Sequence, residues 1–240
     1  MRFRHTPTWF LFTVGFSALL WSGTGVPLPR KGKLPPDLSQ ILSRMEEAAK
    51  RLRTLSANLE YTKVTVLVND KSTETGHLFL RKGKTPEIRI EFQQPETKVI
   101  LLKKNKAEIY LPKINQVQEY NLEQKAGLVE EFMLLGFGSE TGVLSLKKSY
   151  TVRYLKEEEL EGDTTAVLEL IPRKESIASQ LMRIQMWVSE ESWLPVEQQL
   201  FEPSGDYLIA RYSAVKVNLG IPSSTFELHP AEGAKRVKMN

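Results

Sequence analysis

Hydrophobic and polar positions alternate along much of the middle of the chain. Ile88, Ile90 and Phe92 are separated by single charged residues, so one face of this segment is apolar and the other is charged. A period of two is typical of a half-buried antiparallel strand. The breaks between neighbouring segments are polar or contain proline, and they are too short for a crossover helix. The pattern from residue 76 to residue 122 therefore predicts five short strands joined as an antiparallel meander.

Further strands are expected on both sides of this meander. Residues 57–68 should form one, with a bulge near Thr62–Lys63 that keeps two sets of apolar residues on the buried face, followed by a turn at Asn69-Asp70-Lys71. In the C-terminal half, strands are expected at residues 149–155, 165–171, 181–188, 194–201, 207–217 and 226–228, with an acidic turn at Glu157–Asp163. The total is about eleven strands, and one antiparallel sheet of that size must curl or close.

Two segments have helical rather than strand periodicity. From Asp37 to Leu55, apolar residues recur at steps of three and four, and Asp37 with Gln40 fits a capping pair. Residues 123–138 fit a short helix ended by Gly136 or Gly138. This second helix is either a connection packed on the core or a movable lid with glycine hinges. Together the patterns predict a mainly β fold of the α+β type.

The first 36 residues have a different composition. Residues 1–25 combine a basic start at Arg2 and Arg4, an apolar run and a group of small residues, a pattern typical of a cleaved secretory signal peptide. The apolar run is shorter than a bilayer span requires, although an uncleaved membrane anchor is the alternative. Residues 26–36 contain four prolines and three basic residues, which is typical of a linker. Residues 37–240 are expected to form one domain.

Composition and motifs exclude several classes of function. The net charge is +4, and part of it lies in the expected signal peptide, so we expect no nucleic-acid partner. There is no cysteine, and His77 and His229 lack companions at metal-ligand spacing, so neither a metal nor a cofactor is expected. The glycine-rich segment Gly136–Gly142 lacks the features of a phosphate loop. Without a catalytic constellation, the chain is predicted to be a container rather than an enzyme.

Several short motifs in order then carry a family resemblance. Gly76-x-Leu78, Pro86-x-x-x-Ile90-x-Phe92-x-x-Pro95 and Ile109-Tyr110-x-Pro112 are followed by Ile184-x-Met186-Trp187-Val188, Leu194-Pro195 and Phe226-x-Leu228-x-Pro230-x-x-Gly233. Across about residues 37–237, this series resembles the LolA-type outer-membrane lipoprotein carrier and sorting proteins. The resemblance implies an unclosed half β-barrel whose concave apolar face is covered by helices.

The resemblance also implies a function and partners. These proteins shuttle acylated lipoproteins through the periplasm, from an inner-membrane ABC lipoprotein exporter to an outer-membrane acceptor. The same fold also serves lipid carriers and envelope sensors, so a regulatory binding module is the alternative. The family carriers have an arginine beside a proline that helps to hold the lid shut. Here Arg81 and Lys82 are the latch candidates, but the adjacent proline is missing.

Candidate residues for an acyl-chain cavity follow from the apolar positions of the strands and of the expected lid. A long acyl chain can be held by packing alone, since each buried CH₂ contributes roughly 0.8 kcal/mol. Each candidate could equally be a filled core position. The cargo is expected to be a lipoprotein or a lipid, and the protein is expected to be a monomer. The candidates are Ile88, Ile90, Phe92, Leu101, Phe132, Met133, Met186 and Leu200.

Overall fold

The computed structural model divides the chain into two compact units, Met1–Leu34 and Pro35–Asn240. It describes residues 37–103, 105–122, 137, 143 and 146–239, all of which lie in the second unit. The expected signal peptide, the whole linker and most of the expected lid, including Phe132 and Met133, lie outside these residues.

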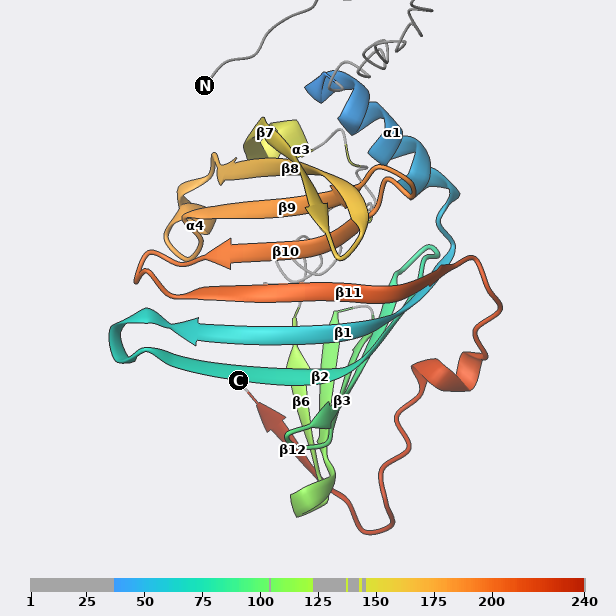
Figure 1. The fold of residues 1–240 in the computed structure, drawn as a ribbon. Helices are drawn as coiled ribbons and strands as arrows, with labels where there is room; N and C mark the ends of the chain where they lie inside the picture. The colour runs from blue at the N-terminus through green and yellow to red at the C-terminus, as the bar shows by residue number, and fades with distance from the viewer. Residues whose placement is uncertain (1–36, 104, 123–136, 138–142, 144–145, 240) are drawn as a thin grey trace, which may run out of the picture. The chain divides into compact units, whose positions relative to one another are not determined.

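A single 12-stranded sheet dominates the second unit (Figure 1). Its order is β12-β6-β5-β4-β3-β2-β1-β11-β10-β9-β8-β7, so β12 and β7 are free edges and the sheet is not closed. Neighbouring strands are antiparallel except for β12, which runs parallel to β6. The strands are β1 (Thr54–Thr65), β2 (Asp70–Arg81), β3 (Glu87–Gln94), β4 (Lys98–Lys103), β5 (Lys106–Leu111), β6 (Gln116–Asn121), β7 (Tyr150–Leu160), β8 (Asp163–Pro172), β9 (Arg183–Ser189), β10 (Pro195–Phe201), β11 (Tyr207–Val217) and β12 (Lys235–Met239).

The mainly β, unclosed half-barrel predicted from the sequence is confirmed. Figure 1 shows the curvature directly, because β3 and β6 run at a steep angle to β1 and β11. Two details differ from the prediction. Residues 226–228 are not a strand, since Ser223–Phe226 forms the 3₁₀ helix η4. Strand β12 was not predicted at all, because its basic composition hides its strand character.

Helices are few and short in the described part of the chain. The principal one, α1 (Leu38–Arg51), packs Ile41, Leu42 and Met45 into the core. Asp37 is the N-cap residue, as predicted, and its carboxylate accepts a hydrogen bond from the Ser39 backbone N–H. The predicted end at Leu55 is too late, because β1 has already begun there. The others are η1 (Val66–Val68), η2 (Pro112–Ile114), α3 (Leu146–Ser149) and α4 (Glu175–Ala178).

The β1–β2 hairpin is more regular than the sequence indicated. Its register runs without a shift from Thr54–Arg81 to Thr65–Asp70, so the predicted bulge at Thr62–Lys63 is absent. Val66, Leu67 and Val68 turn the chain as a 3₁₀ helix and stay exposed, with Leu67 at 93%. The prediction that both sets of apolar residues in 57–68 lie on the buried face is therefore wrong for Val66 and Val68, which belong to the second set.

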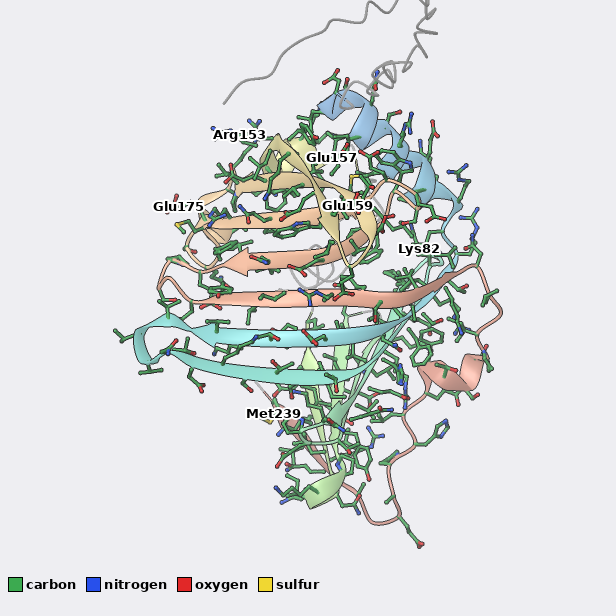
Figure 2. All side chains as sticks on the ribbon, in the orientation of Figure 1. Lys82, Arg153, Glu157, Glu159, Glu175 and Met239 are labelled. Atoms are coloured by element: carbon green, nitrogen blue, oxygen red, sulfur yellow. The ribbon has the colours of Figure 1, made fainter. Side chains whose placement is uncertain are left out.

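The acidic segment predicted to be a turn is mostly strand. Glu157 and Glu159 belong to β7, on which Figure 2 labels them. The turn itself is confined to Glu161-Gly162, where both residues have positive φ. Glu158 accepts a hydrogen bond from the Trp187 indole N–H at 2.9 Å, which ties the hairpin to β9.

One glycine is required by a close approach between strands. The register of β2 against β3 shifts between Thr75 and Gly76. A Cβ atom at Gly76 would lie 1.9 Å from the carbonyl oxygen of Glu91, which no real side chain tolerates. The bulge increases local twist, at the point where the sheet bends toward β3.

The convex face of β3–β6 is covered by the chain's own C-terminal arm, residues 218–239. Phe226 in this arm is 1% exposed, and the Arg81 guanidinium lies 4.5 Å from its ring. The Tyr110 hydroxyl accepts a hydrogen bond from the Ala231 N–H at 3.1 Å. Arg89 donates to the Glu227 carbonyl at 2.9 Å. The arm thus supplies the convex face with a partner from the same chain.

Candidate ligand-binding cavity

The concave face is filled at one end and hollow at the other. Over β7, β8 and β9, buried side chains such as Leu168 and Met186 belong to one core with α1. Over β1–β6, β10 and β11 lies a cavity of about 670 Å³. The described residues that line it are Leu59, Tyr61, Glu74, Leu78, Ile90, Phe92, Lys98, Ile100, Leu102, Ala107, Ile109, Tyr120, Leu122, Gln180, Leu181, Gln198, Leu200, Glu202, Leu208, Ala210 and Tyr212.

The cavity wall is mostly aliphatic and aromatic because strand alternation places one parity of each strand on it. Ile90 and Ile100 are cross-strand partners, and so are Tyr61 and Ala210. The rings of Tyr61 and Phe92 meet edge to face at 6.2 Å between centroids. The volume of the cavity lies within the range of roughly 300–1,000 Å³ found for sites that bind small molecules.

The seam between β1 and β11 contributes two tyrosines with shifted acidity. Burial raises the pKa of Tyr212, and the nearby Tyr61 adds to that rise. Burial is also the main cause of the raised pKa of Tyr61, and the negative charges of Glu74 and Glu202 raise this pKa further. Both phenols therefore stay protonated at neutral pH and act as hydrogen-bonding groups rather than as bases.

Charged side chains reach the cavity at the hairpin ends of β2, β4 and β10. The Lys98 ammonium lies 2.7 Å and 2.8 Å from the two carboxylate oxygens of Glu74. The same ammonium lies 4.6 Å from the centre of the Phe92 ring. Glu202 lines the same cavity without a basic partner among the described residues.

The candidate residues chosen from the sequence separate into groups in the structure. Ile90, Phe92 and Leu200 line the cavity. Ile88 and Met186 are buried in the core and do not line it. Phe132 and Met133 lie outside the described residues.

Leu101 must be removed from the candidate set. It is 4% exposed, but it pairs with Arg89 and Glu108, whose side chains project from the convex face. Its neighbours Ile100 and Leu102 line the cavity, and successive side chains in a strand point to opposite faces. The physical reason is the covering arm, which makes both faces of β4 apolar and removes the alternation that would have marked its parity.

The two latch candidates occupy different environments. The Lys82 ammonium donates to the carbonyl of Ala49 in α1 at 3.0 Å and to the carbonyl of Phe137 at 3.5 Å. Desolvation lowers its pKa, and Arg53 adds to the effect. Figure 2 labels Lys82 at this corner of the unit. Arg81 instead pairs with Glu87, 2.7 Å from Nε to the carboxylate, on the side of the arm.

Phe137 belongs to the segment of residues 123–138, called the insert below, and packs against the cavity wall. It is 1% exposed, and its ring meets the cavity-lining Tyr212 edge to face at 5.3 Å between centroids. Tyr212, Tyr61 and Ala210 were not among the residues selected from the sequence. Their alternation was visible, but nothing local in the sequence shows that β11 lies beside β1.

The described residues hold neither a metal-binding cluster nor a long apolar helix. In this part of the chain, no three His, Cys, Asp or Glu side chains gather closely enough to hold a metal ion. Within the same residues, no helix has both the length and the hydropathy needed to cross a bilayer.

Two sequence relatives bear on the resemblance. An outer-membrane lipoprotein carrier protein from Coxiella burnetii is 24% identical over 210 residues, which cover 84% of this chain and 92% of the relative. An uncharacterized protein from Methanocaldococcus jannaschii is 31% identical over 93 residues. That match covers 39% of this chain and only 25% of the archaeal protein.

Two solved structures show the same fold. An uncharacterized conserved protein from Thermus thermophilus matches with a TM-score of 0.55 at 12% identity, over 84% of this chain and 98% of that one. MucB matches with a TM-score of 0.51 at 12% identity, over 80% of this chain and 62% of MucB.

A family model described as "-like: Uncharacterized protein" matches residues 88–219, from β3 to just beyond β11. The similarity to a lipoprotein carrier over most of both chains confirms the resemblance to LolA-type proteins seen in the sequence. Because the family model covers more than half of the chain, the protein belongs to the family that this model describes.

Proposed function

We propose that this protein is a carrier that holds the acyl chains of lipoproteins or lipids in the hollow of its sheet. The single observation that supports this most is the cavity of about 670 Å³ with its aliphatic and aromatic lining. The Coxiella burnetii relative is named an outer-membrane lipoprotein carrier protein, which supports the proposal. On this proposal the protein has no catalytic role.

The energetics favour a hydrocarbon ligand. Burying about 14 CH₂ groups of one acyl chain gains roughly 11 kcal/mol before the cost of association. That cost is estimated at about 4–15 kcal/mol, so it offsets much of the gain from one chain, and burial of a second chain would raise the affinity. Such a ligand can be held by packing against the apolar side chains of Ile90, Phe92 and Leu200, without any directional polar contact.

Lys82 is the proposed latch of the cavity cover. Its hydrogen bonds to Ala49 and Phe137 join α1 to the insert that carries Phe137. Because Phe137 packs on Tyr212 in the cavity wall, release of this tie would free one side of the cavity for ligand entry. The segment of residues 123–138 then acts as the lid.

Location and partners follow from the same proposal. The signal-like residues 1–25 would direct export to the periplasm. There the carrier would receive cargo from an inner-membrane ABC lipoprotein exporter and deliver it to an outer-membrane acceptor. We propose that it works as a monomer.

A direct test is the binding of a fluorescent fatty-acyl probe, together with native mass spectrometry of protein purified from the envelope. Ala210→Trp, which fills the cavity from β11, should weaken probe binding at least about tenfold. Ser213→Trp is the matched control, because Ser213 is exposed on the opposite face of the same strand. Leu102→Trp fills the cavity from β4 and guards against a misfolded first variant. Protein without co-purifying lipid and without probe binding would refute the carrier.

A sensor of the cell envelope is the second candidate function. It is favoured by the fold shared with MucB, which has been crystallised with its partner MucA from Pseudomonas aeruginosa. A transfer assay between donor and acceptor vesicles separates the two functions. A carrier moves a labelled lipoprotein, whereas a sensor fails to do so and instead retains one stoichiometric membrane protein in a pulldown.

A further inference from the structure

The charged groups of the cavity are unequal in sign. Lys98 is the one basic side chain among the described residues that line it, whereas Glu74 and Glu202 are both acidic. These groups come from β2, β4 and the end of β10, and all three face the same hollow. A ligand whose chain fills the apolar wall would place its head group near them if the head stays at this end.

The single lysine is already neutralised. Both carboxylate oxygens of Glu74 lie within hydrogen-bonding distance of its ammonium. The pair is partly buried, with side-chain exposures of 26% for Lys98 and 24% for Glu74. The face of the Phe92 ring fills a further side of the ammonium at 4.6 Å. An incoming anion would therefore have to displace Glu74 and leave a carboxylate unpaired in a partly desolvated position.

Glu202 adds a negative charge that nothing in the described lining balances. Its influence extends to the neighbouring phenol, because Glu202 and Glu74 both help to raise the pKa of Tyr61, after burial. The local field therefore disfavours a second negative charge. At a separation of about 8 Å and intermediate dielectric, repulsion between like charges amounts to roughly a 10–30-fold loss in affinity.

We propose that this cavity selects acyl chains attached to an uncharged head through an ester or amide, and discriminates against free fatty acids and other anionic lipids. This inference rests on the proposed carrier function and names its substrate class. An acylated protein terminus presents such a head, because its chains are linked through neutral ester or amide groups. Glu74, Lys98 and Glu202 are the specificity-determining residues, while the apolar wall supplies the affinity.

The test compares ligands of equal chain length and different head charge on the purified protein. Monopalmitoylglycerol and palmitate are each used, below their micelle concentrations, to displace a neutral fluorescent acyl probe. The neutral lipid is expected to compete at least about tenfold better than the anion. Equal competition, or stronger competition by palmitate, overturns the selectivity and leaves the carrier intact. Failure of every probe to bind overturns the carrier and this inference together.

Single substitutions test which residues cause the preference for the neutral lipid over palmitate. Glu202→Gln removes the unbalanced charge and should lower the ratio of monopalmitoylglycerol affinity to palmitate affinity several-fold. Glu74→Gln releases Lys98 and should lower this ratio further, by about tenfold or more. Glu96→Gln is the matched control, because Glu96 forms a similar 2.6 Å pair with Lys113 away from the cavity lining. An unchanged ratio of the two affinities in both cavity variants would show that these residues do not set the preference.

Discussion

The two faces of strand β4 are both apolar, yet among the described residues only one of them is covered by another segment of the chain. On the convex face, Leu101 is 4% exposed and pairs across the strands with Arg89, which donates to the Glu227 carbonyl of the C-terminal arm. On the concave face, Ile100 and Leu102 look into a cavity. Within the part of the chain that the structure describes, the same strand therefore presents one face that is packed and one face that borders a cavity.

The difference teaches that an apolar face is not by itself a site. Burial on the convex side stabilises the fold, because Phe226 and the hydrogen bond from Ala231 to Tyr110 complete it. Burial on the concave side is left incomplete, and an incompletely filled wall loses dispersion contacts that a ligand can restore. In strand β4, packing within the fold and the proposed binding thus use opposite faces.

The largest effect is expected from emptying the convex side. Phe226→Ala should lower the free energy of unfolding by about 3–5 kcal/mol, since it removes a fully buried ring and leaves a void. Chemical denaturation measures this loss, and acyl-probe binding of the protein that remains folded should not change. A loss below about 1 kcal/mol would mean that the arm is dispensable for stability.

Two adjacent substitutions in β4 test the comparison more sharply. Leu101→Ala should cost about 2–4 kcal/mol, because its side chain is 4% exposed. Ile100→Ala should cost only about 1 kcal/mol or less, because its side chain already borders empty space. The same denaturation experiment reports both values. Equal costs would contradict the assignment of the hollow to the concave side.

A smaller effect is expected from the polar seam between arm and sheet. Tyr110→Phe removes the hydroxyl that accepts from Ala231 and donates to Asn115 at 3.2 Å. Loss of these bonds should cost about 1–2 kcal/mol. Hydrogen exchange of the Ala231 amide should accelerate together with that of β12, while amides of β1 keep their protection.

The smallest effect concerns Lys82, on the concave side. Its pKa lies below the ordinary 10.5, mainly through desolvation and then through Arg53. Between the folded-state pKa and 10.5 the unfolded chain binds more protons, so stability should rise with pH in that window. Lys82→Met should remove this rise, as thermal melts at increasing pH would show. If the variant and the parent protein show the same dependence of stability on pH, the pKa of Lys82 is not lowered by burial in the folded state.

Local alternation was enough to predict the strands and their facing. Ile88, Ile90 and Phe92 have the expected parity. The strand number required only that the sheet curl or close, and the resemblance to LolA-type proteins implied that it stays open. The position of β12 could not be predicted, because Lys235–Met239 has no apolar face and is placed by the arm that precedes it.

Half of the cavity was also beyond the reach of local patterns. Tyr61 and Ala210 face each other only because β1 pairs with β11, a long-range pairing that turn chemistry does not encode. Leu101 was misplaced because an apolar run with both faces covered carries no parity signal. The charged triad of Glu74, Lys98 and Glu202 has the same origin, since its members come from three separate hairpin ends.

The seam between β1 and β11 has a consequence for how the chain reaches this state. Strands β1–β6 and β7–β11 are each built from sequence neighbours, but the bond from Arg53 to Asn218 joins residues 165 positions apart. Closing so long a loop is slow compared with forming hairpins. During synthesis the N-terminal part of the chain is made first. One edge of β1 therefore stays unpaired until β11, in the last third of the sequence, has been made. During that interval the unpaired edge of β1 can pair with another chain, so we expect the nascent protein to be prone to aggregation.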